Sequence, residues 1–294
     1  MNTLFLGTCT ALITPFNKNG VDFANFEKQI ERQLSNKIKT LAVCTTTGET
    51  PTLTDFEYKQ VIEFAVNVIN KRATVIVGTG SNCTKTAISN SIFAEKAGAD
   101  GLLVVTPYYN KCTQNGIVKY YTDVAESVKI PVIAYNVPSR TGVNILPETM
   151  QKISLIPNVV GIKEASGDLQ QVKRTIKLTR GNAKIYCGDD ALYYDFLKSG
   201  ASGCVSAVSN VFPKEFDDIY LNYISKKYNR AKTIQHDLKE LIDALYVEVN
   251  PIPVKYVLKL LKLDSGILRL PLTELEKEHK KLVKTAIFKS GVKL

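Results

Sequence analysis

Residues 159–168 read VVGIKEASGD, a short apolar run that ends in a lysine and continues into a polar loop. Because successive side chains of a strand alternate between its faces, Val159, Gly161 and Lys163 are predicted on one face and the residues between them on the other. If Lys163 points into a closed sheet, burial disfavours its charged form and leaves an amine that can attack a ketone. The alternative is a lysine that reaches solvent at the strand end. The small Gly161 beneath it and the polar loops around it favour the buried lysine.

Seven further runs resemble this one, and each is bounded by Gly, Pro, Asn or Asp, as strands usually are. The eight predicted strands are Thr8–Ile13, Leu41–Cys44, Thr74–Val77, Gly101–Val105, Val132–Tyr135, Val159–Lys163, Lys184–Cys187 and Gly203–Ser206. Amphipathic stretches lie between them, which predicts a parallel sheet with both faces covered. We expect an α/β fold, a closed (β/α)8 TIM barrel with a C-terminal helical appendage. The rival open sheet usually carries a G-x-G-x-x-G turn after its first strand, and we find none.

Helix signals support this reading. Thr54 and Glu57 form a capping-box pattern before an apolar stripe at positions 62, 65, 66 and 69. Pro147 is placed to open another helix. After Pro213 the strand signals stop, and apolar stripes over 234–245 and 254–261 predict helices. We therefore predict a catalytic barrel over residues 1–226 and a helical region over 227–294 that packs on it.

The composition is that of a globular protein, with 45% hydrophobic residues in a chain of 294. The net charge of +10 comes from dispersed lysines, without the aromatic interleaving of a nucleic-acid site, so we expect a solvated basic surface or a basic cleft for small anions. The six cysteines form no C-x-x-C pair, and no segment has the character of a secretory signal or a membrane span. These features predict a cytoplasmic protein with no nucleic-acid or membrane partner.

Only two histidines occur, His236 and His279, and both fall in the predicted C-terminal helical region. A Ser-His-Asp triad, a Cys-His pair and a His-rich zinc site are therefore not expected. The acidic residues of the strand-end loops are too scattered to match a known ligand pattern, so we predict no metal site; they are Glu49, Asp168, Asp189 and Asp190.

Candidate functional residues lie where the predicted strands end, because barrel enzymes carry their active sites at the carboxyl ends of the strands. Tyr135 ends the strand next to that of the lysine and can relay protons, although a core aromatic with a wet hydroxyl is the alternative. Thr46 and Thr47, in a turn opened by Gly48, can bind a carboxylate or form an ordinary polar turn. Arg140 can bind a carboxylate with two hydrogen bonds or remain a surface arginine.

These segments together resemble a known family. The stretch GIKEASGD around Lys163 is similar to the Schiff-base signature of the dihydrodipicolinate synthase and N-acetylneuraminate lyase superfamily. The resemblance extends through TTGE at 46–49, TPYYN at 106–110, YNVP at 135–138 and NPIPVK at 250–255, so it spans essentially the whole chain. It implies that Lys163 holds pyruvate as an imine. Because an imine is itself an electron sink, the resemblance implies that no metal or organic cofactor is needed.

Within the superfamily, SRTG at 139–142 resembles the synthase branch, in which the matching arginine holds the carboxylate of aspartate semialdehyde. Sialic acid lyases typically lack it. The implied reaction condenses pyruvate with L-aspartate 4-semialdehyde to 4-hydroxy-tetrahydrodipicolinate, in the diaminopimelate route to lysine. Two alternatives stay open, namely another pyruvate-dependent class I aldolase of the superfamily and a catalytically silent barrel that binds a keto acid.

The resemblance also implies roles for individual residues. Hydroxyl groups of Thr47, Tyr135 and Tyr109 would form a proton relay, and Thr46 and Thr47 would bind the pyruvate carboxylate. Gly188 and Val205 would line the pocket. In the family the residue matching Tyr109 reaches the partner subunit's site, which implies at least a dimer, and the common assembly is a tetramer built as a dimer of dimers.

The sequence departs from the family pattern in two places. Thr45 stands where the family usually has Gly before the threonine pair, so we expect a differently shaped turn. Tyr58 and Thr86 stand where lysine-inhibited members often carry His and Glu, although Asn82 is retained. We therefore expect weak or absent feedback inhibition by lysine.

Overall fold

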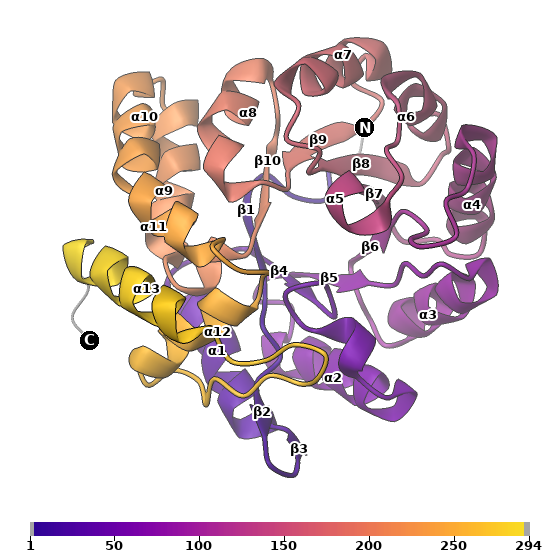
Figure 1. Cartoon of the computed structure of the whole chain (residues 1–294). Helices are drawn as coiled ribbons and strands as arrows, with labels where there is room; N and C mark the ends of the chain where they lie inside the picture. Colours follow the sequence, from indigo (N-terminus) through magenta and orange to yellow (C-terminus); the bar gives the residue numbers. More distant parts are fainter. Residues whose placement is uncertain (1–2, 291–294) are drawn as a thin grey trace.

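The computed structural model describes residues 3–290 and contains a closed barrel of eight parallel strands (Figure 1). The first strand, β1, pairs with β10 on one side and with β4 on the other, which closes the sheet. The predicted TIM barrel is therefore confirmed. Its strands are β1 (Gly7–Ala11), β4 (Thr40–Val43), β5 (Thr74–Gly78), β6 (Gly101–Val105), β7 (Val132–Asn136), β8 (Val159–Glu164), β9 (Lys184–Cys187) and β10 (Gly203–Ser206).

The strand predictions need two corrections. A small hairpin of β2 (Phe16–Asn17) and β3 (Gly20–Val21) was not predicted, because strands of two residues leave no periodic signal. The facing of Val159 was also wrong. It packs in the outer core, whereas Gly161 and Lys163 face the barrel interior. The register between β7 and β8 shifts at Val132/Ile133, and such an irregularity breaks simple alternation.

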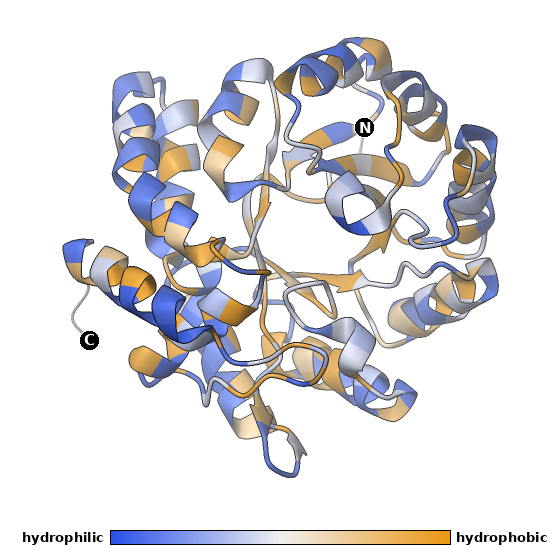
Figure 2. Cartoon of the chain, viewed as in Figure 1, coloured by the Kyte–Doolittle hydropathy of each residue, from blue (hydrophilic) through white to orange (hydrophobic). Residues whose placement is uncertain are grey.

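Helices surround the barrel, with their polar faces outward and apolar faces toward the strands (Figure 2). The capping box of Thr54 and Glu57 is present at the start of α2, and Pro147 occupies the first turn of α6, both as predicted. The helices up to α9 are α1 (Phe23–Ser35), α2 (Asp55–Ile69), α3 (Thr84–Lys96), α4 (Gln114–Glu126), α5 (Pro138–Thr141), α6 (Pro147–Ile153), α7 (Leu169–Thr179), α8 (Tyr193–Ser199) and α9 (Pro213–Ile224). Short 3-10 turns follow β4, β9 and β10 as η1 (Thr50–Thr52), η2 (Asp190–Leu192) and η3 (Val208–Asn210).

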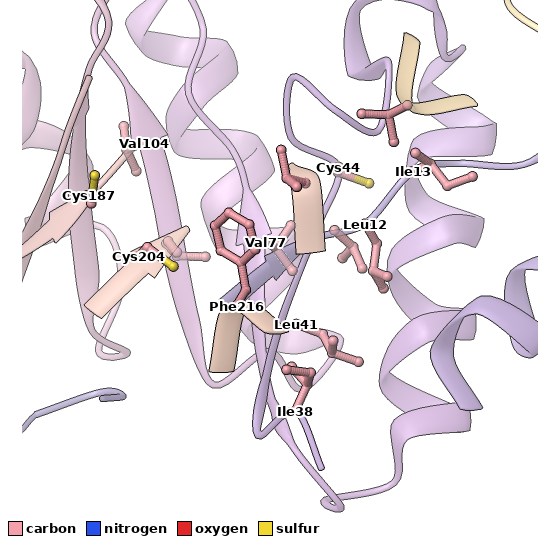
Figure 3. Packing of buried hydrophobic residues seen from close by; sticks show 14 of the residues in the cluster. Leu12, Ile13, Ile38, Leu41, Cys44, Val77, Val104, Cys187, Cys204 and Phe216 are labelled. Carbon is pink, nitrogen blue, oxygen red and sulfur yellow. The ribbon is translucent and has the colours of Figure 1, made fainter. Parts of the chain in front are cut away.

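The main hydrophobic core fills the space between strands and helices. Figure 3 shows part of it from close by, with Phe216 of α9 and side chains of several strands, including Val77, Val104 and Cys204. Phe216 is fully buried, so its replacement by alanine is expected to cost about 3–5 kcal/mol. This layer holds the helices against the barrel and so fixes the ends of the strands.

A second, smaller core fills the barrel itself. Near its floor the rings of Phe5 and Tyr186 stack with centroids 4.1 Å apart, and the Tyr186 hydroxyl donates to the Phe5 carbonyl at 2.9 Å. Gly161 makes room for this pair, because a Cβ at that position would lie 2.7 Å from the Tyr186 ring. The barrel is therefore closed by packed side chains below the level of Lys163.

The C-terminal region forms α10 (Tyr228–Asp237), α11 (Lys239–Leu245), α12 (Ile252–Leu260) and α13 (Lys277–Lys289). The apolar stripe over 234–245 belongs to two helices rather than one, which meet at Leu238. The segment between α12 and α13 runs back to α2, where Arg269 pairs with Glu57 (Figure 1). The boundary at residues 226/227 stays a prediction. No helix within residues 3–290 is long and apolar enough to cross a membrane.

Candidate active site

A cavity of about 340 Å³ lies at the carboxyl ends of the strands. Its wall comes from the loops after β4, β7, β8, β9 and β10, together with α11 and the residue before Pro251. Most of the predicted site residues line it, namely Thr46, Thr47, Tyr135, Arg140, Lys163, Gly188 and Val205. A larger groove between α11 and α13 contains none of them.

Lys163 extends from β8 into this cavity and is only 6% exposed. Its Nζ lies 4.2 Å from the centroid of the Tyr135 ring, and within residues 3–290 no carboxylate forms an ion pair with it. Gly188 provides the space for the lysine stem, because a Cβ there would lie 2.9 Å from Lys163 Cε. The site therefore holds a buried amine without a counter-ion, which is the environment that favours nucleophilic lysines.

The strand register places Tyr135 beside Lys163, because their Cα atoms are paired across β7 and β8. On the opposite face of β8, Glu164 is completely buried and accepts hydrogen bonds from the side-chain amides of Asn136 and Gln171 and from the Ser166 N–H. Burial raises the pKa of Glu164, while these hydrogen bonds oppose the shift. This outer network fixes the end of β8 and so the direction in which Lys163 leaves the strand.

The threonine turn after β4 is closed by a hydrogen bond from the Gly48 N–H to the Thr45 carbonyl at 3.0 Å. The Thr47 hydroxyl accepts a hydrogen bond from Asn250 Nδ2 at 2.9 Å, a partner that the sequence analysis did not anticipate. Just beyond the turn, Glu49 forms an ion pair with Lys255 of α12, with 2.5 Å between Oε1 and Nζ. The C-terminal region therefore holds the turn from two sides.

Arg140 belongs to α5, a single helical turn that begins at Pro138 and ends at Gly142 in the left-handed region, with φ of 72°. The side chain is exposed at the cavity mouth, and its Nη2 donates to the Asn250 carbonyl at 3.2 Å. A free face of this guanidinium is available to an anion that enters the cavity.

Tyr109 is the one predicted site residue that this chain does not bring to the cavity. Its side chain is 87% exposed, and its backbone has a positive φ of 74°. The Tyr109 N–H donates to the Thr141 carbonyl at 3.3 Å, which anchors the backbone beside α5. A role for Tyr109 in the relay therefore requires a second subunit, as the family resemblance implies, and it stays a prediction.

Sequence reasoning missed the part of the site that the C-terminal region supplies. Tyr246 lines the cavity and donates to the buried carboxylate of Asp190 at 2.8 Å, and the same oxygen accepts from the Ala207 and Val208 N–H groups. Burial raises the pKa of Asp190. Of the cavity residues that the C-terminal region supplies, only Asn250 had a signal in the sequence, since it opens the stretch NPIPVK.

The fold and the cavity define a (β/α)8 barrel with a buried lysine on its sixth strand, in sequence order, at the mouth of the barrel. Comparison with known proteins identifies the family. The chain belongs to the dihydrodipicolinate synthetase family, whose model matches residues 4–290.

Individual relatives are similar over their whole length. The 4-hydroxy-tetrahydrodipicolinate synthase of Alkaliphilus oremlandii is 45% identical over 289 residues, which cover 98% of this chain and 100% of that one. The crystal structure of dihydrodipicolinate synthase from Thermotoga maritima has a TM-score of 0.96 at 38% identity and covers 98% of this chain and 99% of its own. The chloride-inhibited enzyme from Acinetobacter baumannii, solved with pyruvate, has a TM-score of 0.94 at 40% identity, with 97% and 99% coverage.

Proposed function

We propose that Lys163 carries the chemistry of this chain as an imine with pyruvate. The reaction is the condensation of pyruvate with L-aspartate 4-semialdehyde to 4-hydroxy-tetrahydrodipicolinate, the lyase step of the diaminopimelate route to lysine after which the relatives are named. The observation that carries the assignment to Lys163 is its burial at the barrel mouth without a counter-ion, beside the ring of Tyr135.

In the proposed mechanism Lys163 Nζ attacks C2 of pyruvate, and loss of water gives the imine. Tyr135 and Thr47 move the proton that leaves the methyl group, which converts the imine into an enamine. The enamine carbon attacks the aldehyde, and the new alkoxide takes up a proton. The amino group of the second substrate then attacks C2 and displaces Lys163, so that the sum of the steps is one product and one water from two substrates.

The polar groups of the cavity divide between the substrates in this proposal. Thr46 and Thr47 bind the pyruvate carboxylate, while Gly188 and Val205 shape the pocket around the imine. Arg140 binds the carboxylate of L-aspartate 4-semialdehyde at the mouth. Arg140 is exposed at the cavity mouth, whereas Lys163 is buried. This arrangement supports the assignment, because pyruvate then enters first and lies deeper in the cavity than the aldehyde.

Reductive trapping tests the assignment of the lysine. Borohydride added with pyruvate reduces the imine, so we expect one pyruvate-derived adduct per chain, on Lys163, by peptide mass analysis. Lys163→Arg is the matched control, because it retains a cation but forms no such imine, and it should remain unlabelled. An adduct on another lysine, or none, would contradict the proposal.

Arg140→Ala separates the synthase from another pyruvate-dependent aldolase. With L-aspartate 4-semialdehyde, kcat/KM should fall by about 10²–10³, the effect of losing a bidentate carboxylate contact. The pyruvate adduct on Lys163 should form as in the unchanged chain. An equal loss with aldehydes that lack a carboxylate would favour the other aldolase.

We further propose a cytoplasmic homotetramer built as a dimer of dimers. Tyr109 supports a subunit contact, because its side chain is 87% exposed on an anchored loop and does not line the cavity of its own chain. In sedimentation experiments we expect a mass of four chains, and Tyr109→Ala should lower activity even where it leaves the chain folded.

Feedback inhibition by lysine is proposed to be weak or absent. Tyr58 supports this, because its side chain is buried and its hydroxyl donates to the Gly78 carbonyl at 2.9 Å, so it is not free to bind a ligand. Activity should remain unchanged at sub-millimolar lysine, and a clear inhibition curve in that range would refute the proposal.

A further inference from the structure

One residue of the C-terminal region contacts both halves of the proposed site. Asn250 is 8% exposed and lines the cavity just before α12. Its side-chain Nδ2 donates to the Thr47 hydroxyl at 2.9 Å, while its backbone carbonyl accepts from Arg140 Nη2 at 3.2 Å. The Asn250 side chain therefore contacts Thr47, which would bind pyruvate, and the Asn250 backbone contacts Arg140, which would bind the aldehyde.

The bond to Thr47 constrains where the threonine proton can go. A hydroxyl group carries a single proton to donate and accepts through its lone pairs. Because Thr47 Oγ1 accepts from the Asn250 amide, its own proton remains available to another acceptor. The side-chain oxygen of Asn250, Oδ1, is buried and has no hydrogen-bond partner within the described residues. It therefore does not compete for the Thr47 proton.

We propose that Asn250 is a positioning residue that holds the Thr47 hydroxyl as a proton donor toward the reacting groups in the cavity. This inference rests on the proposed function, because it assigns a direction to the relay that serves the pyruvate imine. Without the amide donor, the Thr47 hydroxyl is free to rotate and donates in the productive direction only part of the time. If an acceptor replaces the amide donor of Asn250, the Thr47 hydroxyl donates its proton to that acceptor instead of to the reacting groups.

Two substitutions separate these cases. Asn250→Asp keeps the shape of the side chain but replaces the donor by an acceptor, whereas Asn250→Ala removes the side chain. Both retain the backbone carbonyl that holds Arg140. Val249→Ala is the matched control, because Val249 is the preceding residue, is 46% exposed and does not line the cavity.

The readout is the exchange of pyruvate methyl protons with D2O, followed by NMR without the aldehyde, since it reports enamine formation alone. We expect exchange to slow about tenfold in Asn250→Ala, which is the loss of one hydrogen bond, and about 100-fold in Asn250→Asp, which is the lower range of general acid–base catalysis. The KM for L-aspartate 4-semialdehyde should stay within about twofold, because the contact to Arg140 is retained. Val249→Ala should exchange at the rate of the unchanged chain.

A double substitution tests whether Asn250 acts through Thr47. If it does, Thr47→Val with Asn250→Ala exchanges no more slowly than Thr47→Val alone, because the effects are not additive. Additive losses, or full exchange in Asn250→Asp, overturn the inference. Borohydride trapping on Lys163 in each variant shows that the chain is folded and forms the imine. Failure of trapping in the unchanged chain overturns the proposed function instead.

Discussion

Two lysines among residues 3–290 are buried, Lys163 and Lys255, and their surroundings differ in the partners of the Nζ atom. Lys255 is fully buried, and its Nζ contacts the Glu49 carboxylate at 2.5 Å, the Ile267 carbonyl at 2.8 Å and the face of the Phe16 ring at 4.2 Å. Lys163 has an aromatic ring at the same distance but no carboxylate among the described residues.

Burial is common to both lysines, so the presence or absence of partners for the Nζ atom is what separates them. Burial lowers the pKa of Lys255, and the adjacent Glu49 opposes that shift and keeps the ammonium paired. The amine of Lys255 is occupied by partners that belong to the fold. Lys163 has no carboxylate or carbonyl partner among the described residues, so its Nζ is left free on the wall of the cavity. We therefore expect the first lysine to stabilise the fold and the second to lower its stability.

The largest effect expected from this comparison is on stability. Lys255→Met leaves the Glu49 carboxylate buried without a partner, which should lower the free energy of unfolding by about 3–5 kcal/mol in denaturant titrations. Combining it with Glu49→Gln removes the orphaned charge and should recover most of the loss. If the single and double substitutions were equally destabilised, the ion pair would not be the cause.

Lys163→Met should act in the opposite direction. It replaces a buried, unpaired amine by an apolar side chain of similar length, so we expect the free energy of unfolding to rise by about 1–2 kcal/mol while synthase activity is lost. The denaturation midpoints of Lys163→Met and Lys255→Met, measured under the same conditions, should therefore shift in opposite directions. A loss of stability would mean that Lys163 has partners in the folded chain that the comparison omits.

The smallest effect concerns the outer ion pair of the same C-terminal segment. Hydrogen bonds from Arg269 lower the pKa of Glu57 to about 2, so the pair stabilises the fold above the ordinary glutamate pKa. That stability is lost as the pH falls from about 4.5 toward 2, because the unfolded chain then binds more protons. After allowing for solvent screening we expect about 1 kcal/mol. Thermal melts of Glu57→Gln across this range should depend less on pH than those of the unchanged chain.

The barrel was predictable because each strand carries a local signal. Every predicted strand overlaps an observed one, and Lys163 could be placed at the mouth from its position at the end of an apolar run. Relations between distant residues carry no such signal. Asn250 reaches Thr47 across 203 positions, and Glu49 was considered only as a metal ligand, although it pairs with Lys255. The register shift that turns Val159 outward depends on the neighbouring strand, which no pattern within β8 could indicate.

The contact between Thr47 and Asn250 also has a consequence for how the chain is made. The ribosome delivers the N-terminal end first, and all eight strands of the barrel have emerged before residue 250 is synthesised. The sheet can close at that stage, but the threonine turn still lacks Asn250 and the Glu49 partner on α12. A nascent chain or a fragment that ends near residue 226 would thus have a barrel but would lack the part of the cavity wall that α11, Tyr246 and Asn250 supply. The cavity would be complete only after the last part of the chain is translated.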